Sequence, residues 1–178
     1  MKEIKLTQGK VALVDDEDYE RLNKSRWLVD TYHTTDYAYR FLIRNLNGER
    51  KKSKLYMHNE ILVSPLGMEI DHRDSNGLNN QKFNLRFCTK SQNQGNSKSR
   101  TGTSKYKGVS WDRKSRKWFA GIKVSGYRTH LGSFEAEKDA ALVYNVAAIE
   151  HFGEFARLNT VNQVSREDIL GKLEELGL

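Results

Sequence analysis

Cysteine, proline and long apolar runs are all scarce in this sequence, and these scarcities exclude several classes of protein. The one cysteine, Cys88, cannot form a disulfide within the chain, nor can it build a structural zinc site that needs several cysteines. No apolar run approaches the roughly 20 residues that a helix needs to span a bilayer. Residues 1–7 lack the apolar core of a signal peptide. We therefore expect a cytoplasmic protein with no membrane partner.

Acidic residues are in the minority, and the basic excess is uneven along the chain. The 178 residues include 30 Lys or Arg and 23 Asp or Glu, which gives a net charge of +7. Residues 97–133 contain ten basic residues and one acid, Asp112, whereas residues 134–178 contain four basic residues and nine acids. A basic block of this kind favours a polyanionic partner. A solvated charged surface is the alternative.

Hydrophobic periodicity and turn signals predict an α+β chain made of several small parts. The expected parts are a strand-rich region at 1–54, a polar module at 55–96, a flexible basic linker at 97–104, a sheet-and-helix domain at 105–160 and a helical tail at 161–178. Strands are expected at 11–14, 27–29, 37–43, 54–57, 106–111, 117–124 and 127–132. Helices are expected at 16–23, 58–63 and 135–152. Alternating apolar residues also predict a small hairpin, formed by Met68 and Ile70 and by Phe83, Leu85 and Phe87.

The polar module contains the residue types that phosphodiester hydrolysis requires. His72 titrates near neutral pH and suits a general base that takes a proton from water. Asp71 and Asn93 offer a carboxylate and an amide oxygen, which suit one magnesium ion, for which manganese can substitute. Asn84 either orients the imidazole or holds the intervening loop. A surface ion pair in an Asn-rich turn is the alternative for these residues.

The same module closely resembles the HNH endonucleases, in particular the subgroup found in phage and mobile-element homing enzymes. The resemblance covers about residues 55–96 and rests on the segments 56–61, 69–80, 83–89 and 92–93. It implies two strands and a helix around one metal ion, with His72 as general base, Asp71 and Asn93 as metal ligands, and Asn84 in support. His58 matches the leading histidine, in a structural or a catalytic role. Asn59 departs from the family, because an arginine is expected there.

The domain at 105–160 resembles the ethylene-response-factor (Apetala-type) DNA-binding domain. The matching segments include 106–109, 117–123, 131–134 and 158–159. The resemblance implies a three-stranded sheet that reads DNA and a helix that packs behind it. Ser110 and His130 stand where arginine and tryptophan are usual, and Gly121 replaces a typical glutamate. The expected DNA-binding residues are Lys107, Ser110, Arg113, Arg116, Trp118, Lys123, Arg128 and His130.

Together these features predict a metal-dependent endonuclease that acts on double-stranded DNA, with no small-molecule substrate, in a bacterial or phage-infected cell. A DNA-binding regulator with a silent nuclease module is the first alternative, and an RNA-binding protein is the second. The sequence leaves three questions open: the recognition sequence, whether one strand or both strands are cut, and the oligomeric state. For residues 1–54, an additional DNA contact is one option.

Overall fold

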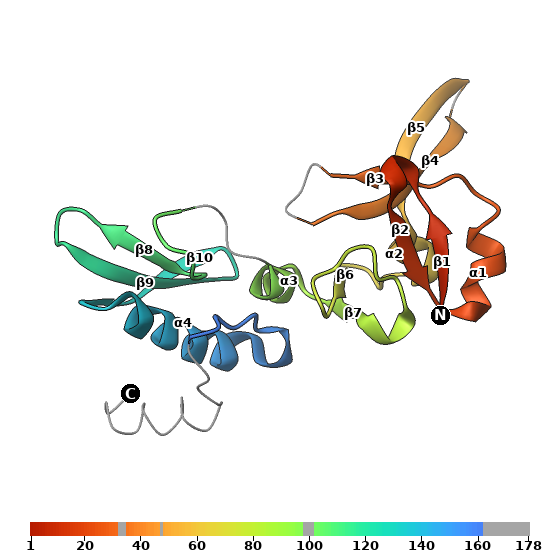
Figure 1. The fold of residues 1–178 in the computed structure, drawn as a ribbon. Coiled ribbons are helices and arrows are strands. Elements are labelled where there is room, and N and C mark those ends of the chain that lie inside the picture. Colours follow the sequence, from red (N-terminus) through yellow and green to blue (C-terminus); the bar gives the residue numbers. More distant parts are fainter. Residues whose placement is uncertain (32–34, 47, 98–101, 162–178) are drawn as a thin grey trace. The chain divides into compact units, whose positions relative to one another are not determined.

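The computed structural model describes residues 1–31, 35–46, 48–97 and 102–161. The chain is a mixed α+β protein with small antiparallel sheets and few helices (Figure 1). Its contacts divide it into two compact units, Met1–Thr89 and Lys90–Leu178. None of the helices in these described ranges is long and apolar enough to cross a membrane. Apart from Val161, the helical tail expected at 161–178 lies outside the described residues.

The first unit begins with a small hairpin and a short helix. Strand β1 (Lys2–Lys5) pairs antiparallel with β2 (Val11–Val14) across the 3-10 turn η1 (Thr7–Gly9). Helix α1 (Asp16–Leu22) follows, and the three acids of its first turn suit the positive end of a helix. The sequence predicted β2 and α1 but not β1, which is too short and too polar to show a pattern.

A second sheet in this unit has the order β3-β4-β5 and is antiparallel. Its strands are β3 (Leu28–Asp30), β4 (Tyr37–Leu46) and β5 (Glu49–Tyr56). Both β4 and β5 extend well beyond the expected 37–43 and 54–57. Because β3 pairs only with residues 37–39, the rest of β4 and β5 forms a two-stranded ribbon. Most side chains of the ribbon's far part are exposed, so no apolar alternation marked it in the sequence.

The core of the first unit is built mainly from its N-terminal part. Trp27 is 1% exposed, and its indole nitrogen donates a hydrogen bond of 2.8 Å to the carbonyl oxygen of Leu22. The other members of the core cluster are Ile4, Leu6, Ala12, Val14, Leu22, Val29, Ala38 and Met57. Met57 opens helix α2 (Met57–Ile61), which connects this core to the polar module.

The polar module continues with a hairpin and a long intervening loop. Strand β6 (Glu69–His72) pairs with β7 (Leu85–Cys88), which follows the 3-10 turn η2 (Lys82–Asn84). The hairpin predicted from the alternating apolar residues is confirmed. Ile70 and Leu85 are buried, whereas Met68, Phe83 and Phe87 are exposed. The loop docks on β2, because the amide of Leu13 bonds to the carbonyl of Leu78 and the amide of Asn80 bonds to the carbonyl of Leu13, each at 2.8 Å.

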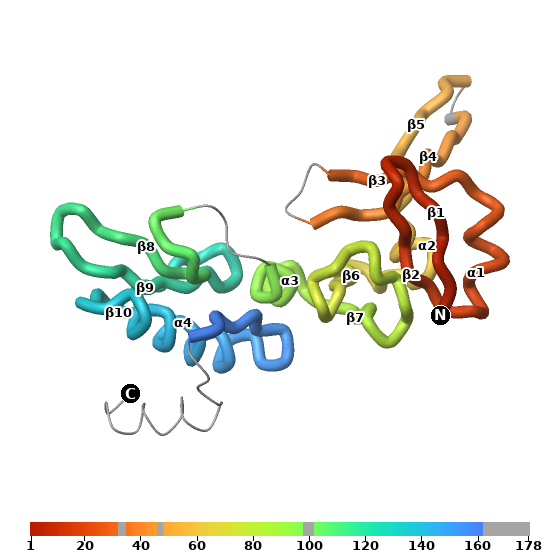
Figure 2. Tube along the Cα trace, in the orientation of Figure 1, coloured from red at the N-terminus to blue at the C-terminus, as the bar shows by residue number. Residues whose placement is uncertain are grey.

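The second unit is a three-stranded antiparallel sheet with a helix on one face (Figure 2). Its elements are α3 (Lys90–Asn96), β8 (Val109–Asp112), β9 (Lys117–Val124), β10 (Tyr127–Phe134), α4 (Glu137–Phe152) and η3 (Gly153–Phe155). Ala120 and Ile122 of β9 are buried with the small residues of α4. At the end of α4, Phe152 is buried and His151 is exposed. Ser104, at the end of the expected linker, is buried against Glu137.

Candidate active site

Asp71 and His72 lie next to each other on β6, and both are buried. Asp71 is 5% exposed and His72 is 4% exposed. Successive side chains of a strand point to opposite faces, so the two residues look into different surroundings. In the register of the hairpin, Asp71 stands opposite Arg86. The Nε and Nη2 atoms of Arg86 donate hydrogen bonds of 2.9 and 2.8 Å to the Asp71 Oδ2 atom.

His72 lies in an aromatic pocket closed by two side chains from neighbouring elements. Its ring centre is 5.7 Å from that of Tyr37 on β4 and 5.1 Å from that of His58 on α2. The Nε2 atom of His72 is 3.4 Å from the side-chain oxygen of Asn80. Burial lowers the pKa of His72 below its usual value, against the opposing effects of Asn80, Asp74 and Asp71. His72 is therefore neutral at physiological pH, which is the form that accepts a proton.

The ring of His58 packs against His72 and Tyr56. Its ring stacks on Tyr56 at 5.6 Å, nearly parallel, and meets His72 edge-on. Burial, followed by the neighbouring His72, lowers the pKa of His58 to about 3. The sequence left a structural or a catalytic role open for His58. A neutral ring packed between aromatic groups fits the structural role.

Asn84 holds the loop between the two strands. Its side-chain oxygen accepts a bond from the amide of Asp74 at 3.1 Å, and its Nδ2 donates to the Asp74 carboxylate at 2.9 Å and to the carbonyl of Asn79 at 2.8 Å. Asn84 is 2% exposed. These bonds match the loop-holding role, the second of the two that the sequence left open.

Asn80 is the neighbour of His72 that reasoning from the sequence missed. It is 1% exposed, and within the described part of the chain its Nδ2 atom is buried with no hydrogen-bond partner. The sequence shows only that Asn80 lies in the polar loop at 73–80. Nothing in the sequence distinguishes it from the other asparagines of that loop. Arg86 and Tyr37 were missed as well, since only the strand register and the fold bring them to Asp71 and His72.

Asn93 lies on α3 and therefore belongs to the second unit, whose position relative to the first is not determined. The structure brings His72, Asp71 and Asn84 into one unit, and the joining of Asn93 to Asp71 stays a prediction.

The outer face of the sheet in the second unit carries several of the expected DNA-binding residues. Lys123 pairs with Arg128, Gly121 with His130, and Phe119 with Ser110, so these side chains share one face. His130 stacks on Phe119 with ring centres 4.3 Å apart, and the Arg128 guanidinium lies 5.3 Å from the same ring. Lys123, Arg128 and His130 are exposed. Arg113 and Arg116 are exposed in the turn between β8 and β9.

Two expected DNA-binding residues are engaged inside the unit instead. Trp118 shares the face of Ala120 and packs on the core cluster, with its ring 5.0 Å from Trp111, so it lies on the helix side of the sheet. The Lys107 ammonium donates to the backbone carbonyls of Gln94 and Gly95 at the end of α3, where a helix leaves acceptors unpaired. Burial lowers the pKa of Lys107 to about 8. Neither side chain belongs to the exposed sheet face.

Comparison with known proteins places the chain in a family. No protein-family model and no solved structure matches it. It is 36% identical over 100 residues to an uncharacterized HNH endonuclease of Acanthamoeba polyphaga mimivirus. The aligned segment covers 55% of this chain and 50% of that protein. The chain is also 33% identical over 94 residues to protein 3.8 of Escherichia phage T7. The aligned segment covers 52% of this chain and 77% of that protein. The chain belongs to the family of phage T7 protein 3.8.

In this member of the protein 3.8 family, the oxygen ligands expected for a metal are a carboxylate and an amide. Magnesium takes few protein ligands, prefers carboxylate and amide oxygens, and keeps waters or substrate phosphate as its other ligands. The described residues contain no group of three or more His, Cys, Asp or Glu that could hold a metal ion. A carboxylate and an amide oxygen, the groups that Asp71 and an asparagine carry, are the ligand types that magnesium prefers.

Proposed function

We propose that this protein is an HNH-type endonuclease that hydrolyses phosphodiester bonds of double-stranded DNA. The observation that carries the proposal is the buried Asp71–His72 pair on β6, with a neutral imidazole next to a carboxylate. The 36% identity to a viral HNH endonuclease supports it, although the chain spans only half of that relative's length. The basic net charge of +7 suits a polyanionic substrate.

His72 acts as the general base in this proposal. The contact between His72 Nε2 and the side-chain oxygen of Asn80 favours the tautomer that carries its proton on Nε2. The lone pair is then on Nδ1, which takes a proton from the attacking water. Burial keeps the ring in this neutral form. Asn84 positions the loop that carries Asn80, and thereby the base.

Asp71 and Asn93 would hold one magnesium ion, for which manganese can substitute. When bound, the ion supplies positive charge that neutralises the scissile phosphate and stabilises the leaving 3′ oxygen. Arg86 holds the Asp71 carboxylate in place through Oδ2. The resemblance to the HNH endonucleases implies products with 5′ phosphate and 3′ hydroxyl ends.

The exposed sheet face of the second unit would target the nuclease to DNA. A three-stranded sheet presents side chains to the major groove, where long basic side chains meet phosphates and base edges. We assign Ser110, Arg113, Arg116, Lys123, Arg128 and His130 to this surface, and leave out Trp118 and Lys107. Targeting by a linked module raises the local concentration of DNA at the nuclease without new contacts there.

Cleavage of supercoiled plasmid and of long genomic DNA tests the proposal. Wild type, His72→Ala and the matched control His151→Ala, which changes an exposed histidine on α4, are compared with magnesium, with manganese and with chelator. Metal-dependent cleavage that is lost in His72→Ala and kept in His151→Ala is expected. Cleavage unchanged in His72→Ala contradicts the catalytic role. Tight duplex binding without cleavage favours a silent nuclease module, and tighter binding of RNA than of duplex DNA favours an RNA-binding protein.

A further inference from the structure

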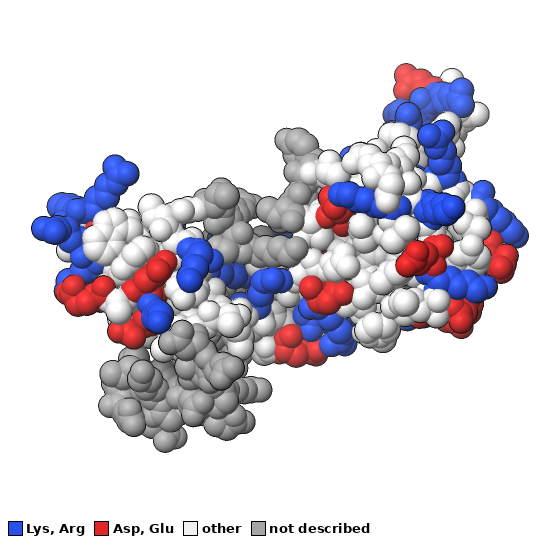
Figure 3. All heavy atoms as spheres, in the orientation of Figure 1, with Lys and Arg blue, Asp and Glu red and all other residues white. Residues whose placement is uncertain are grey.

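The ribbon formed by β4 and β5 carries a strong positive charge that the nuclease chemistry does not use. Residues 40–54 include six Lys or Arg and one acid, Glu49. In the space-filling view, basic side chains gather over the far end of this ribbon (Figure 3). A basic surface on the same compact unit as His72 suggests a contact with the substrate itself.

The two faces of the ribbon differ. Cross-strand partners share a face, and the pairs Tyr39–Tyr56, Phe41–Lys54, Ile43–Lys52 and Asn45–Arg50 therefore form one side, here named the strip face. On the opposite side, Arg40 pairs with Glu60 at 2.7 Å, and Lys51 lies 3.7 Å from Glu49. On the strip face, Lys54 pairs with Asp30 at 2.6 Å. Among the described residues, no carboxylate lies within ion-pair distance of Lys52 or Arg50.

The strip face leads directly to the proposed general base. A chain of ring contacts runs from His72 to His58 at 5.1 Å, to Tyr56 at 5.6 Å, to Tyr39 at 6.1 Å and to Phe41 at 5.4 Å. Lys52 lies over the Phe41 ring at 3.6 Å. Phe41 is 38% exposed and Ile43 is 49% exposed, so the outer half of the strip is open to a partner.

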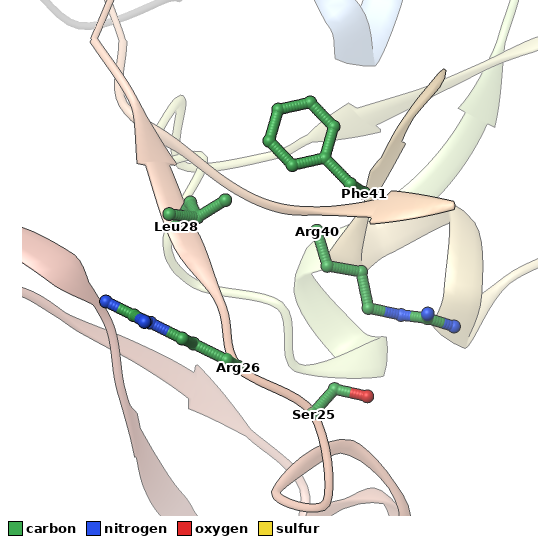
Figure 4. A pocket seen from close by; sticks show the side chains of 5 residues that line it. All are labelled: Ser25, Arg26, Leu28, Arg40 and Phe41. Carbon is green, nitrogen blue, oxygen red and sulfur yellow. The ribbon is translucent and has the colours of Figure 1, made fainter. Parts of the chain in front are cut away.

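A pocket of about 510 Å³ lies at the start of β3, where β4 continues beyond its pairing with that strand (Figure 4). Ser25, Arg26, Leu28, Arg40 and Phe41 line it. Its lining includes the exposed Arg26, whose side chain points away from Phe41.

We propose that the strip face binds the backbone of duplex DNA beside the cleavage site, with Arg50 and Lys52 on phosphates. This inference rests on the proposed action on DNA. The major groove is about 12 Å wide and admits a two-stranded ribbon. Successive cross-strand pairs on the strip face are two residues apart along the strand, which is about 6.8 Å. Three such steps place Arg50 about 20 Å from the Tyr39–Tyr56 pair. A length of about 20 Å measured along the helix axis spans about six phosphates of each strand.

The test measures binding rather than cleavage, so its failure is distinct from failure of the nuclease proposal. Binding of a labelled 30-base-pair duplex of arbitrary sequence is measured over a range of salt concentrations with chelator present. The ribbon variant Arg50→Gln/Lys52→Gln is compared with wild type and with the control variant Lys5→Gln/Lys24→Gln. The control removes the same charge from two exposed positions elsewhere in the first unit. All four are surface substitutions, and circular dichroism checks that each variant is folded.

The expected result is weaker duplex binding by the ribbon variant, with a slope of log K against log salt that is smaller by about 1.8, or about 0.9 for each lost phosphate contact. The control variant keeps the wild-type slope. Equal slopes for the ribbon and control variants overturn the proposal, as does a wild type that binds no duplex. A loss confined to a single-stranded oligonucleotide of the same length overturns the assignment to duplex DNA.

Discussion

Replacing Asn84 tests whether the loop beside His72 depends on one buried amide. Asn84→Ala removes three hydrogen bonds, two to the backbone of Asp74 and Asn79 and one to the Asp74 carboxylate. A neutral bond contributes about 1 kcal/mol and a bond to a charged group at least about 1.5 kcal/mol. The variant should therefore lose about 3.5 kcal/mol of unfolding free energy in the first unit.

Asn84→Asp distinguishes this network from a simple loss of packing. It keeps the size of the side chain but places a second carboxylate where the amide now donates to Asp74 at 2.9 Å. Two carboxylates at this distance raise the pKa of one of them, so the folded pair keeps a proton that the unfolded chain has lost. At pH 7 the unfolding free energy of Asn84→Asp should therefore be lower than that of Asn84→Ala. This difference should shrink as the pH falls from 7 towards 4.

A urea titration read from the indole NMR signal of Trp27 measures both effects. Trp27 is buried in the core of the first unit and bonds to Leu22, so its signal reports unfolding of that unit alone. A loss below about 1 kcal/mol in Asn84→Ala would mean that the bonds contribute little net stability. A difference between the Ala and Asp variants that does not change with pH would refute the carboxylate argument.

Three further predictions follow from the structure. The pKa of His58 is lowered to about 3, so below pH 6.5 the unfolded chain takes up a proton that the folded chain does not. Between pH 6 and 4 the first unit should lose about 1.4 kcal/mol per pH unit from this group; urea titrations should show a flatter profile for His58→Gln. Arg86→Met should cost about 3–5 kcal/mol by removing the guanidinium that forms the buried ion pair with Asp71, and adding Asp71→Asn should restore part of it in a double-mutant cycle. Gly108→Ala should destabilise the second unit by about 3 kcal/mol or more in thermal unfolding, because φ is +76° there and the new methyl group would overlap the Tyr144 ring.

The sequence predicted best the elements whose signals are local. Strand β9 matches its expected range of 117–124, because apolar residues alternate there and Ser125-Gly126 marks the turn. The α+β class was confirmed for the same reason. The outer halves of β4 and β5 were missed, since a ribbon exposed on both faces needs no apolar alternation.

The surroundings of the candidate site could be predicted only in part. Asp71, His72 and Asn84 stand out because their residue types suit the chemistry. The ion pair from Asp71 to Arg86 depends on a register that is fixed only after a loop of twelve residues, 73–84, has folded. The contact of Asn80 with His72 depends on the docking of that loop on β2. Long-range pairing of this kind leaves no periodic signal in the sequence.

Residues 1–54 have a structural role that follows from the placement of the core. Of the buried cluster in the first unit, all members except Met57 come from residues 1–54, and Ile61 and Leu78 pack at its edge. The site loop is fixed to this core twice, through the backbone of Leu13 and through Asp15, whose carboxylate accepts a bond of 2.8 Å from the amide of Lys82. The segment that carries Asp71 and His72 is too polar to bury a sizeable core of its own. The strand-rich N-terminal region therefore acts as the scaffold that holds the imidazole of His72 in its pocket, and the same sheet extends outwards as the basic ribbon.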